Sequence, residues 1–277
     1  MRRILVPTDL SPLSTFALKA AARLARHTDA QLFALHVVAL PGGMAVDHHG
    51  LPVNDGTLDP APYLQQGAHA VGALAEWTRA VDLPVEPLLR YGGIADAIVA
   101  EIEQRSIDLL VIGTKGGDSL RDRLVGLLVE HLIGRVSIPV LTLKEGHPGQ
   151  SAHRILFANA FARPHQYFDV LREFHDSAGS TIELLRVNTP RDSLPVEEVR
   201  LRMDRFAADN HLTRYSKHVV KAPTVEEGVL QWTELHGGDL LAMRTHGRGG
   251  FARLIKGCVS LDLVKSLKMP ILTMRGT

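Results

Sequence analysis

Four glycines that follow a short apolar run are the part of this sequence best suited to chemistry. The run is Leu109–Ile112, and the glycines are Gly113, Gly116, Gly117 and Gly126. Glycine has no Cβ, so the backbone can turn sharply and its amide groups can come close to another group. Amides at the start of a helix favour an anion such as phosphate. The spacing indicates a phosphate site, but the same glycines are also typical of a tight turn with close helix–strand packing and no ligand.

The elements on either side of these glycines are predicted by the pattern of apolar residues. An unbroken apolar run such as Leu109–Ile112 is typical of a strand that is buried on both faces of a parallel sheet. From Leu120 to Arg135 the apolar residues recur at helical spacing. The sequence therefore predicts a strand, a glycine turn and a helix.

This pattern occurs twice, which indicates a duplicated domain. The segment that begins at Asp108 aligns without a gap with the one that begins at Asp239, at an offset of 131 (239 − 108) that still holds at the closing prolines (270 − 139). The first strand repeats as well, since Arg3–Val6 resembles Arg154–Phe157 at an offset of 151 (154 − 3). The second copy is therefore 20 residues shorter (151 − 131) between its first strand and its glycine turn.

Length, charge and cysteine content limit the classes of protein. A chain of 277 residues is large for one core, so two domains are expected, at 1–146 and 153–277. The 31 basic and 30 acidic residues nearly cancel, which argues against partners such as nucleic acid or a membrane surface. No apolar run could span a bilayer, and the Met-Arg-Arg start leads into a strand rather than a signal peptide. One cysteine, Cys258, excludes an internal disulfide, and we expect a cytoplasmic protein.

Strands and helices are expected to alternate through both copies. In the first copy we expect strands at 3–7, 31–38, 85–90, 109–112 and 138–143, with helices at 12–27, 63–80, 94–104 and 120–135. After a linker at 144–152 we expect strands at 155–158, 181–187, 216–221, 240–244 and 271–274, with helices at 164–177, 195–210, 225–236 and 253–266. This alternation predicts an α/β fold in which each copy is a five-stranded parallel sheet between helices.

Three histidines invite a metal or ligand interpretation that the sequence does not favour. His36 lies within a predicted strand, where a histidine is more often satisfied by the sheet. His48 and His49 lie in the polar loop from Ala39 to Pro62, near Asp47 and Asp55. Adjacent histidines point apart in an extended chain and no spaced partners accompany them, so no metal site is predicted. The loop follows a strand end, where α/β folds place ligands.

The motifs together resemble the universal stress protein family. The amino-terminal Ile4–Asp9 looks like the first strand of that family, and Gly113-x-x-Gly116 followed after nine residues by Gly126 is similar to its phosphate-binding signature. In the second copy Thr245–Arg253 is close to the common wording of the same loop. The resemblance covers essentially the whole chain as two tandem domains.

The resemblance implies a Rossmann-like fold of the adenine nucleotide alpha hydrolase type, with strand order 3-2-1-4-5, that binds ATP in one branch of the family. It places the nucleotide of the first copy, with possible Mg, beside the residues of the loop after the first strand, the end of the second strand and the glycine signature: Pro7, Thr8, Asp9, Val37, Gly113, Gly116, Gly117, Gly126 and Leu127. A carboxylate can accept hydrogen bonds from ribose hydroxyls, and turn amides can hold phosphate oxygens. Asp9 is equally well explained as a helix cap.

Both copies depart from the signature of the family. In the first copy Leu127 replaces the usual Ser or Thr, whose lost hydrogen bond is worth about 0.5–1.5 kcal/mol. In the second copy Asn159 and Ala160 replace Thr8 and Asp9, Arg244 replaces the first glycine, and Cys258 replaces the hydroxyl residue. We therefore expect the second site to be degenerate for ATP.

The predicted function is that of a stress-response binding module, with ATP or another adenine nucleotide in the first domain. The alternative is a scaffold or small-ligand sensor that binds no nucleotide and engages a protein partner. A slow ATPase is disfavoured, because no general base or metal-ligand set is evident near the glycine turn. The resemblance also implies that residues 139–143 and 270–274 pair as antiparallel edge strands, and that the protein forms a homo-oligomer such as a homodimer.

Overall fold

The computed structural model describes residues 1–47, 49–54, 56, 58–114, 120–144, 152–162, 168–245, 267 and 269–275. The chain forms two compact units. One comprises Arg2–Gly113, and the other comprises Thr114–Thr277 together with Met1.

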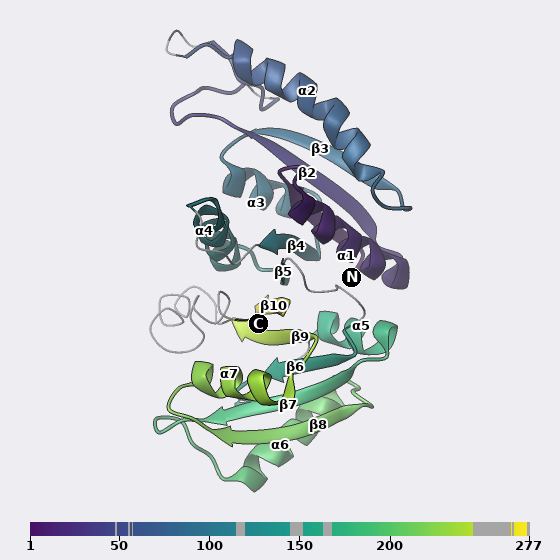
Figure 1. Ribbon diagram of the computed structural model, residues 1–277, viewed down its shortest axis with the longest axis vertical. Coiled ribbons are helices and arrows are strands. Elements are labelled where there is room, and N and C mark those ends of the chain that lie inside the picture. Colours follow the sequence, from purple (N-terminus) through teal and green to yellow (C-terminus); the bar gives the residue numbers. More distant parts are fainter. Residues whose placement is uncertain are drawn as a thin grey trace. The chain divides into compact units, whose positions relative to one another are not determined.

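The unit Arg2–Gly113 is a parallel α/β layer structure (Figure 1). Its elements are β1 (Arg3–Thr8), α1 (Pro12–Thr28), β2 (Gln31–Ala39), α2 (Ala61–Thr78), β3 (Val85–Gly92), α3 (Ile94–Gln104) and β4 (Leu109–Thr114), whose last residue falls in the other unit. Strand β1 is parallel to β2 and β4, and β2 is parallel to β3. The strands therefore follow the order β3-β2-β1-β4.

The apolar runs of β1 and β4 explain why these strands are central. Ile4, Leu5 and Val6 in β1 and the run Leu109–Val111 in β4 are fully buried, as expected for strands covered on both faces. Helix α1 packs on β1 and β2 through an inner face rich in alanine, which lets the helix approach the sheet closely. The helix begins with Pro12, whose missing N–H costs nothing at that position.

The unit Thr114–Thr277 contains the rest of the first repeat and all of the second (Figure 1). Its elements are α4 (Leu120–Arg135), β5 (Val140–Lys144), β6 (Arg154–Ala158), α5 (Asp169–Ala178), β7 (Thr181–Asn188), α6 (Val196–Asp209), β8 (Tyr215–Lys221), α7 (Val225–His236), β9 (Leu240–Thr245) and β10 (Ile271–Arg275). The strand order is β5-β10-β9-β6-β7-β8.

The strand order 3-2-1-4-5 is confirmed for the first repeat, and the second repeat follows it too. In the first repeat β5 follows β4, and the Thr114 hydroxyl donates to the carbonyl of Leu143 over 3.4 Å. In the second repeat the same order reads β8-β7-β6-β9-β10. The predicted α/β class with parallel sheets is therefore correct.

Strands β5 and β10 pair antiparallel, which confirms the predicted edge-to-edge pairing. Leu141 lies opposite Leu272, with Thr142 opposite Ile271 and Val140 opposite Thr273. Because Leu272 is the residue that corresponds to Leu141 at the repeat offset of 131, the pairing is two-fold symmetric about these two leucines. Two strand edges that would otherwise be open are thereby covered.

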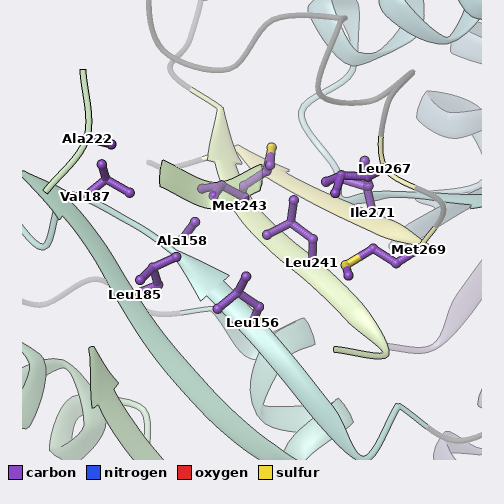
Figure 2. Packing of buried hydrophobic residues seen from close by; sticks show 11 residues of the cluster. Leu156, Ala158, Leu185, Val187, Ala222, Leu241, Met243, Leu267, Met269 and Ile271 are labelled. Carbon is purple, nitrogen blue, oxygen red and sulfur yellow. The ribbon is translucent and has the colours of Figure 1, made fainter. Parts of the chain in front are cut away.

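The second repeat has its own hydrophobic core (Figure 2). Buried side chains from β6, β7 and β9 meet those of Ala222, Leu267, Met269 and Ile271. Helix α7 packs closely on this core, because a Cβ at Gly228 would lie 2.6 Å from the side chain of Val187. The carboxyl ends of β7 and β8 therefore adjoin a well-packed hydrophobic core.

Most expected elements are present, with shifts at their ends. Helix α2 starts and ends two residues earlier than expected; α5 begins at Asp169, and residues 164–167 of the helix expected there lie outside the described residues. The expected helix at 253–266 and residues 145–151 of the expected linker lie outside the described residues. No helix in the described part of the chain is both long and apolar enough to cross a membrane.

Candidate functional site

The loop between β1 and α1 is held by a chain of hydrogen bonds that starts at Thr8. The amide of Leu10 donates to the Thr8 hydroxyl over 2.9 Å, and the Thr8 hydroxyl donates to the Ser14 hydroxyl over 2.9 Å. The Ser14 hydroxyl in turn donates to the carbonyl of Ser11 over 2.9 Å. Thr8 is buried, so this predicted site residue shapes the loop rather than facing solvent.

Asp9 lies on this loop and is exposed. Its Oδ1 atom accepts a hydrogen bond from the amide of Ser11 over 3.1 Å. Between them, Leu10 has φ of 63°, a left-handed conformation that costs energy for a non-glycine residue. The loop thus holds the Asp9 carboxylate at the carboxyl end of β1, the edge at which open α/β sheets bind ligands.

The alternative explanation of Asp9, that it caps helix α1, is wrong. The N-cap residue is Ser11, whose hydroxyl accepts from the amide of Ser14 over 3.3 Å. Asp9 lies two residues earlier and forms a local turn with Ser11 instead. Its presence is therefore not accounted for by helix capping.

Two more predicted site residues lie on the neighbouring strand positions. Pro7 of β1 is in register with Leu35 of β2, and Val37 is half-buried near the end of β2. Between Leu35 and Val37, Nδ1 of His36 lies 2.9 Å from the carbonyl of Thr8. This contact confirms that His36 is satisfied by the sheet.

Gly113 is required by packing. A Cβ at this position would lie 2.7 Å from the carbonyl oxygen of Leu13 and 2.8 Å from its Cγ atom. The end of β4 therefore approaches the first turn of α1 more closely than any side chain would allow. The packing interpretation of the glycines holds for Gly113, which also brings the ends of β1 and β4 to the same edge of the sheet.

Gly126 has a different environment. It lies within α4, beyond the first four residues of the helix, and a Cβ there would meet no atom within 4 Å among the described residues. Inside a helix the backbone amide donates to the carbonyl four residues earlier, so the Gly126 amide is not available to a ligand. What Gly126 can offer a ligand is the space left by its missing side chain. Leu127, next to it, is 59% exposed. Gly116 and Gly117 lie outside the described residues.

The second repeat keeps the shape of the loop but not its carboxylate. Asn159 corresponds to Thr8, and its Oδ1 atom accepts from the amide of Phe161 over 3.3 Å. Phe161 has φ of 49°, as Leu10 is left-handed in the first repeat. The residue between them is Ala160, which has no polar side chain.

Arg186 is a buried residue in this region that the sequence analysis did not single out. It takes the place in β7 that His36 has in β2, and its guanidinium donates to the carbonyl of Ala160. It also donates to Oδ1 of Asn188 over 2.9 Å and to Oδ1 of Asp192 over 2.8 Å. The strand also carries Glu183 and ends in Asn188, so no single charged residue marked Arg186 in the sequence. Arg186 ties the loops after β6 and β7 together, so an internal group occupies the surroundings of Ala160.

Within the described residues, no group of three or more His, Cys, Asp or Glu side chains could hold a metal ion. His48 and Asp55 of the polar loop, together with Cys258, lie outside that part of the chain. The Asp9 loop is a polar loop at the carboxyl end of a parallel sheet.

Comparison with known proteins assigns both repeats to one family. The sequence model of the universal stress protein family matches residues 1–144 and 168–275. A universal stress protein of Methanocaldococcus jannaschii is 29% identical over 146 residues, which cover 52% of this chain and 82% of the relative. Universal stress protein A homolog 1 of Coxiella burnetii is 28% identical over 146 residues, which cover 51% of this chain and 95% of the relative.

Solved structures share the fold over the whole chain. A universal stress protein from Archaeoglobus fulgidus superimposes with a TM-score of 0.73 at 17% identity, covering 99% of this chain and 96% of that one. A putative universal stress protein from Pseudomonas aeruginosa gives a TM-score of 0.66 at 17% identity, covering 100% of this chain and 94% of that one. The likeness shows a Rossmann-like fold in two tandem copies.

Proposed function

The chain belongs to the universal stress protein family, and on that premise we propose that its first repeat binds an adenine nucleotide such as ATP. Family membership supports a role in the stress response. In this proposal the protein is a binding module rather than an enzyme. The fraction of the protein that holds nucleotide reports the level of that nucleotide.

The observation that carries the proposal is the exposed Asp9 carboxylate on a loop of fixed shape. The Thr8–Ser14–Ser11 hydrogen bonds hold the loop, and Ser11 rather than Asp9 caps helix α1. A carboxylate in this position can accept hydrogen bonds from the two ribose hydroxyls. Val37, half-buried near the end of β2, offers an apolar surface to the base.

We assign the phosphates to the glycine signature that ends at Gly126, on the strength of the sequence pattern. Gly126 costs helix stability, and no atom of the described residues lies within 4 Å of where its Cβ would be, so a close approach of the ligand would explain the glycine. Any Mg²⁺ would arrive with the phosphates and keep most of its water ligands, since no protein metal cluster is present among the described residues.

The second repeat is proposed to bind no adenine nucleotide. Ala160 cannot accept ribose hydrogen bonds, and the Arg186 guanidinium donates to the carbonyl of the same residue. Arg186 is buried, and opening the loop after β6 would take the Ala160 carbonyl away from its guanidinium, which is costly for a buried charge.

Calorimetric titration of the full chain with ATP tests the proposal. Asp9→Ala should weaken binding about tenfold, because hydrogen bonds to a charged group contribute roughly 1.5–3 kcal/mol. Asp82→Ala is the matched control: it removes the same charge from an exposed residue of the turn before β3, at the opposite edge of the sheet. This control should bind ATP as the parent does.

No binding of ATP at millimolar concentration by a folded parent chain would contradict the proposal. That result would favour the alternative function, a scaffold or small-ligand sensor that engages partner proteins. Retained self-association of the same sample would then be the property to pursue, measured by sedimentation.

A further inference from the structure

A cavity lies between the loops that follow β7 and β8 in the second repeat. Its volume is about 430 Å³, a size that suits a small ligand. The polar part of its lining includes Asn188, Thr189, Ser193 and Lys221. Its apolar part comes from prolines on both loops and from Ala222. The cavity opens at the carboxyl ends of two parallel strands, where α/β sheets bind ligands.

The walls of this cavity are held in place without a ligand. The Asn188 amide donates to the carbonyl of Leu194 over 2.8 Å, and the amide of Ala222 donates to the carbonyl of Asn188 over 3.1 Å. Thr189 and Asp192 exchange two backbone hydrogen bonds of 3.1 Å, which close the turn between them. Ala222 also belongs to the hydrophobic core, as does Val187 (Figure 2). The cavity is therefore preformed, which lowers the cost of binding.

The charges around the cavity favour an anion. Lys221 is exposed and forms no ion pair with any residue in the described ranges. Ser193 likewise makes no hydrogen bond within the part of the chain that the structure describes, so its hydroxyl can donate. Of the acidic residues close by in the sequence, Asp192 is paired with Arg186, Glu227 accepts from the Thr224 hydroxyl and Glu226 also has an interaction of its own; none of the three lines the cavity.

We propose that this cavity binds a small organic anion, with its carboxylate or phosphate group at Lys221 and Ser193 and its apolar body against Pro190, Ala222 and Pro223. None of the residues that line the cavity carries a carboxylate, so the lining does not repel an anion at Lys221 and Ser193. An inorganic anion alone would leave the apolar wall uncovered, so the apolar body adds affinity by burying that surface.

This cavity is a property of the second repeat. Asn188 pairs with Lys221 across β7 and β8, and the corresponding pair across β2 and β3 of the first repeat is Val38 with Tyr91. Valine and tyrosine supply neither a cation nor a side-chain amide. The proposed anion site is thus independent of the nucleotide proposed for the first repeat.

Titration of the full chain with phenyl phosphate and with benzoate, followed by NMR, tests the proposal. At least one probe should bind and shift the backbone amide signals of the non-proline residues in 188–193 and of Lys221 and Ala222. Lys221→Met keeps the length of the side chain but removes its charge, and should weaken binding about tenfold. Lys221→Arg should bind as the parent does. Arg205→Met removes a charge from an exposed residue of α6 that does not line the cavity, and should have no effect.

Failure of both probes to bind at millimolar concentration would overturn the proposal, as would equal affinity of Lys221→Met and the parent. Gly126→Ala should leave both titrations unchanged, which separates this site from the nucleotide site. Inorganic phosphate that binds as tightly as phenyl phosphate would exclude the role of the apolar wall and so contradict the ligand class.

Discussion

Two glycines of the same signature are explained by different surroundings. Gly113 has the backbone of Leu13 within 2.7 Å of where a Cβ would lie, whereas Gly126 has open space among the described residues. The first is therefore a packing residue, and the second is free to serve a ligand. The sequence pattern alone could not separate these roles, because close packing and close ligand approach both select glycine.

Gly126→Ala should stabilise the fold and weaken ATP binding. Alanine favours a helix interior over glycine by about 0.5–1 kcal/mol, and its methyl group would occupy the space that we assign to the phosphates. Urea unfolding and calorimetry with ATP measure the two effects. A variant that is more stable and binds ATP unchanged would remove Gly126 from the site.

Gly113→Ala is the companion variant, and it should lose stability. Its Cβ would collide with the Leu13 backbone, which cannot move without shifting α1. Overpacking of this kind costs roughly 1–3 kcal/mol. Normal stability in urea would show that β4 and α1 are further apart than the structure places them.

Some site residues could be predicted from the sequence and others could not. Thr8 and Asp9 follow a strand and precede a helix, so their place at the sheet edge followed from the pattern. The sequence could not show that Ser11 is the cap, since several polar residues in this loop have suitable side chains. Arg186 was missed because no motif marks a buried arginine whose partners lie on loops.

At the scale of elements, the pairing of β5 with β10 reproduces the interface of a symmetric dimer inside one chain. The hydroxyl of Thr142 donates to the carbonyl of Ile271 over 3.1 Å, and that of Thr273 donates to the carbonyl of Val140 over 3.3 Å. The repeat offset exchanges these two bonds, as a two-fold axis does in a homodimer.

Thr142→Val and Thr273→Val should therefore destabilise the protein to the same extent. Each removes one buried hydrogen bond worth about 0.5–1.5 kcal/mol while keeping the shape of the side chain. Urea unfolding gives both values. Thr233→Val is a control, because the hydrogen bond that it removes lies within helix α7 and not between β5 and β10. Unequal losses in the free energy of unfolding would show that the two symmetry-related hydrogen bonds do not contribute equally to stability.

The edge strand β8 carries a pH-sensitive contact. His218 of β8 lies 4.4 Å from the ring of Trp232 on α7, and Trp232 lies 4.1 Å from His236. Burial lowers the pKa of His218 below its ordinary 6.5; Glu183 raises it, while His236, Arg154 and Arg200 lower it further. The folded protein therefore resists protonation of His218 more than the unfolded chain does.

Stability should thus fall as the pH drops below about 6.5, since the unfolded chain then binds a proton that the folded state disfavours. Denaturation curves between pH 7.5 and 5, followed by circular dichroism, measure this loss. His218→Gln should show a shallower decline than the parent. An identical decline in both would assign the pH dependence to other groups.

Periodicity predicted most elements because apolar residues recur at strand or helix spacing. The ends of α2 were less accurate because neither end has a side-chain cap or a glycine that would mark it, whereas Gly93 marks the start of α3. The β5–β10 pairing was predictable only through the family resemblance, because edge pairing leaves no periodic signal in a short apolar strand.

At the scale of the whole molecule, the two repeats differ in the groups that lie at the carboxyl ends of their strands. The first repeat keeps a carboxylate on its β1 loop, whereas the second keeps the loop shape, closes it with Arg186 and has a cavity of its own. The internal repeat could be read from the sequence, because it needed only an alignment of the chain with itself. The different fates of the two sites depended on contacts between residues far apart in the sequence.

Equilibrium dialysis of the full chain against saturating ATP measures the number of nucleotides per chain, and this number tests the central claim most directly. We predict one ATP per chain at saturation, and, in dialysis against lower ATP concentrations, a Kd about tenfold higher for Asp9→Ala but unchanged for Asp82→Ala. Two bound nucleotides per parent chain, or one that persists at full affinity in Asp9→Ala, would contradict the assignment of the nucleotide to the first repeat.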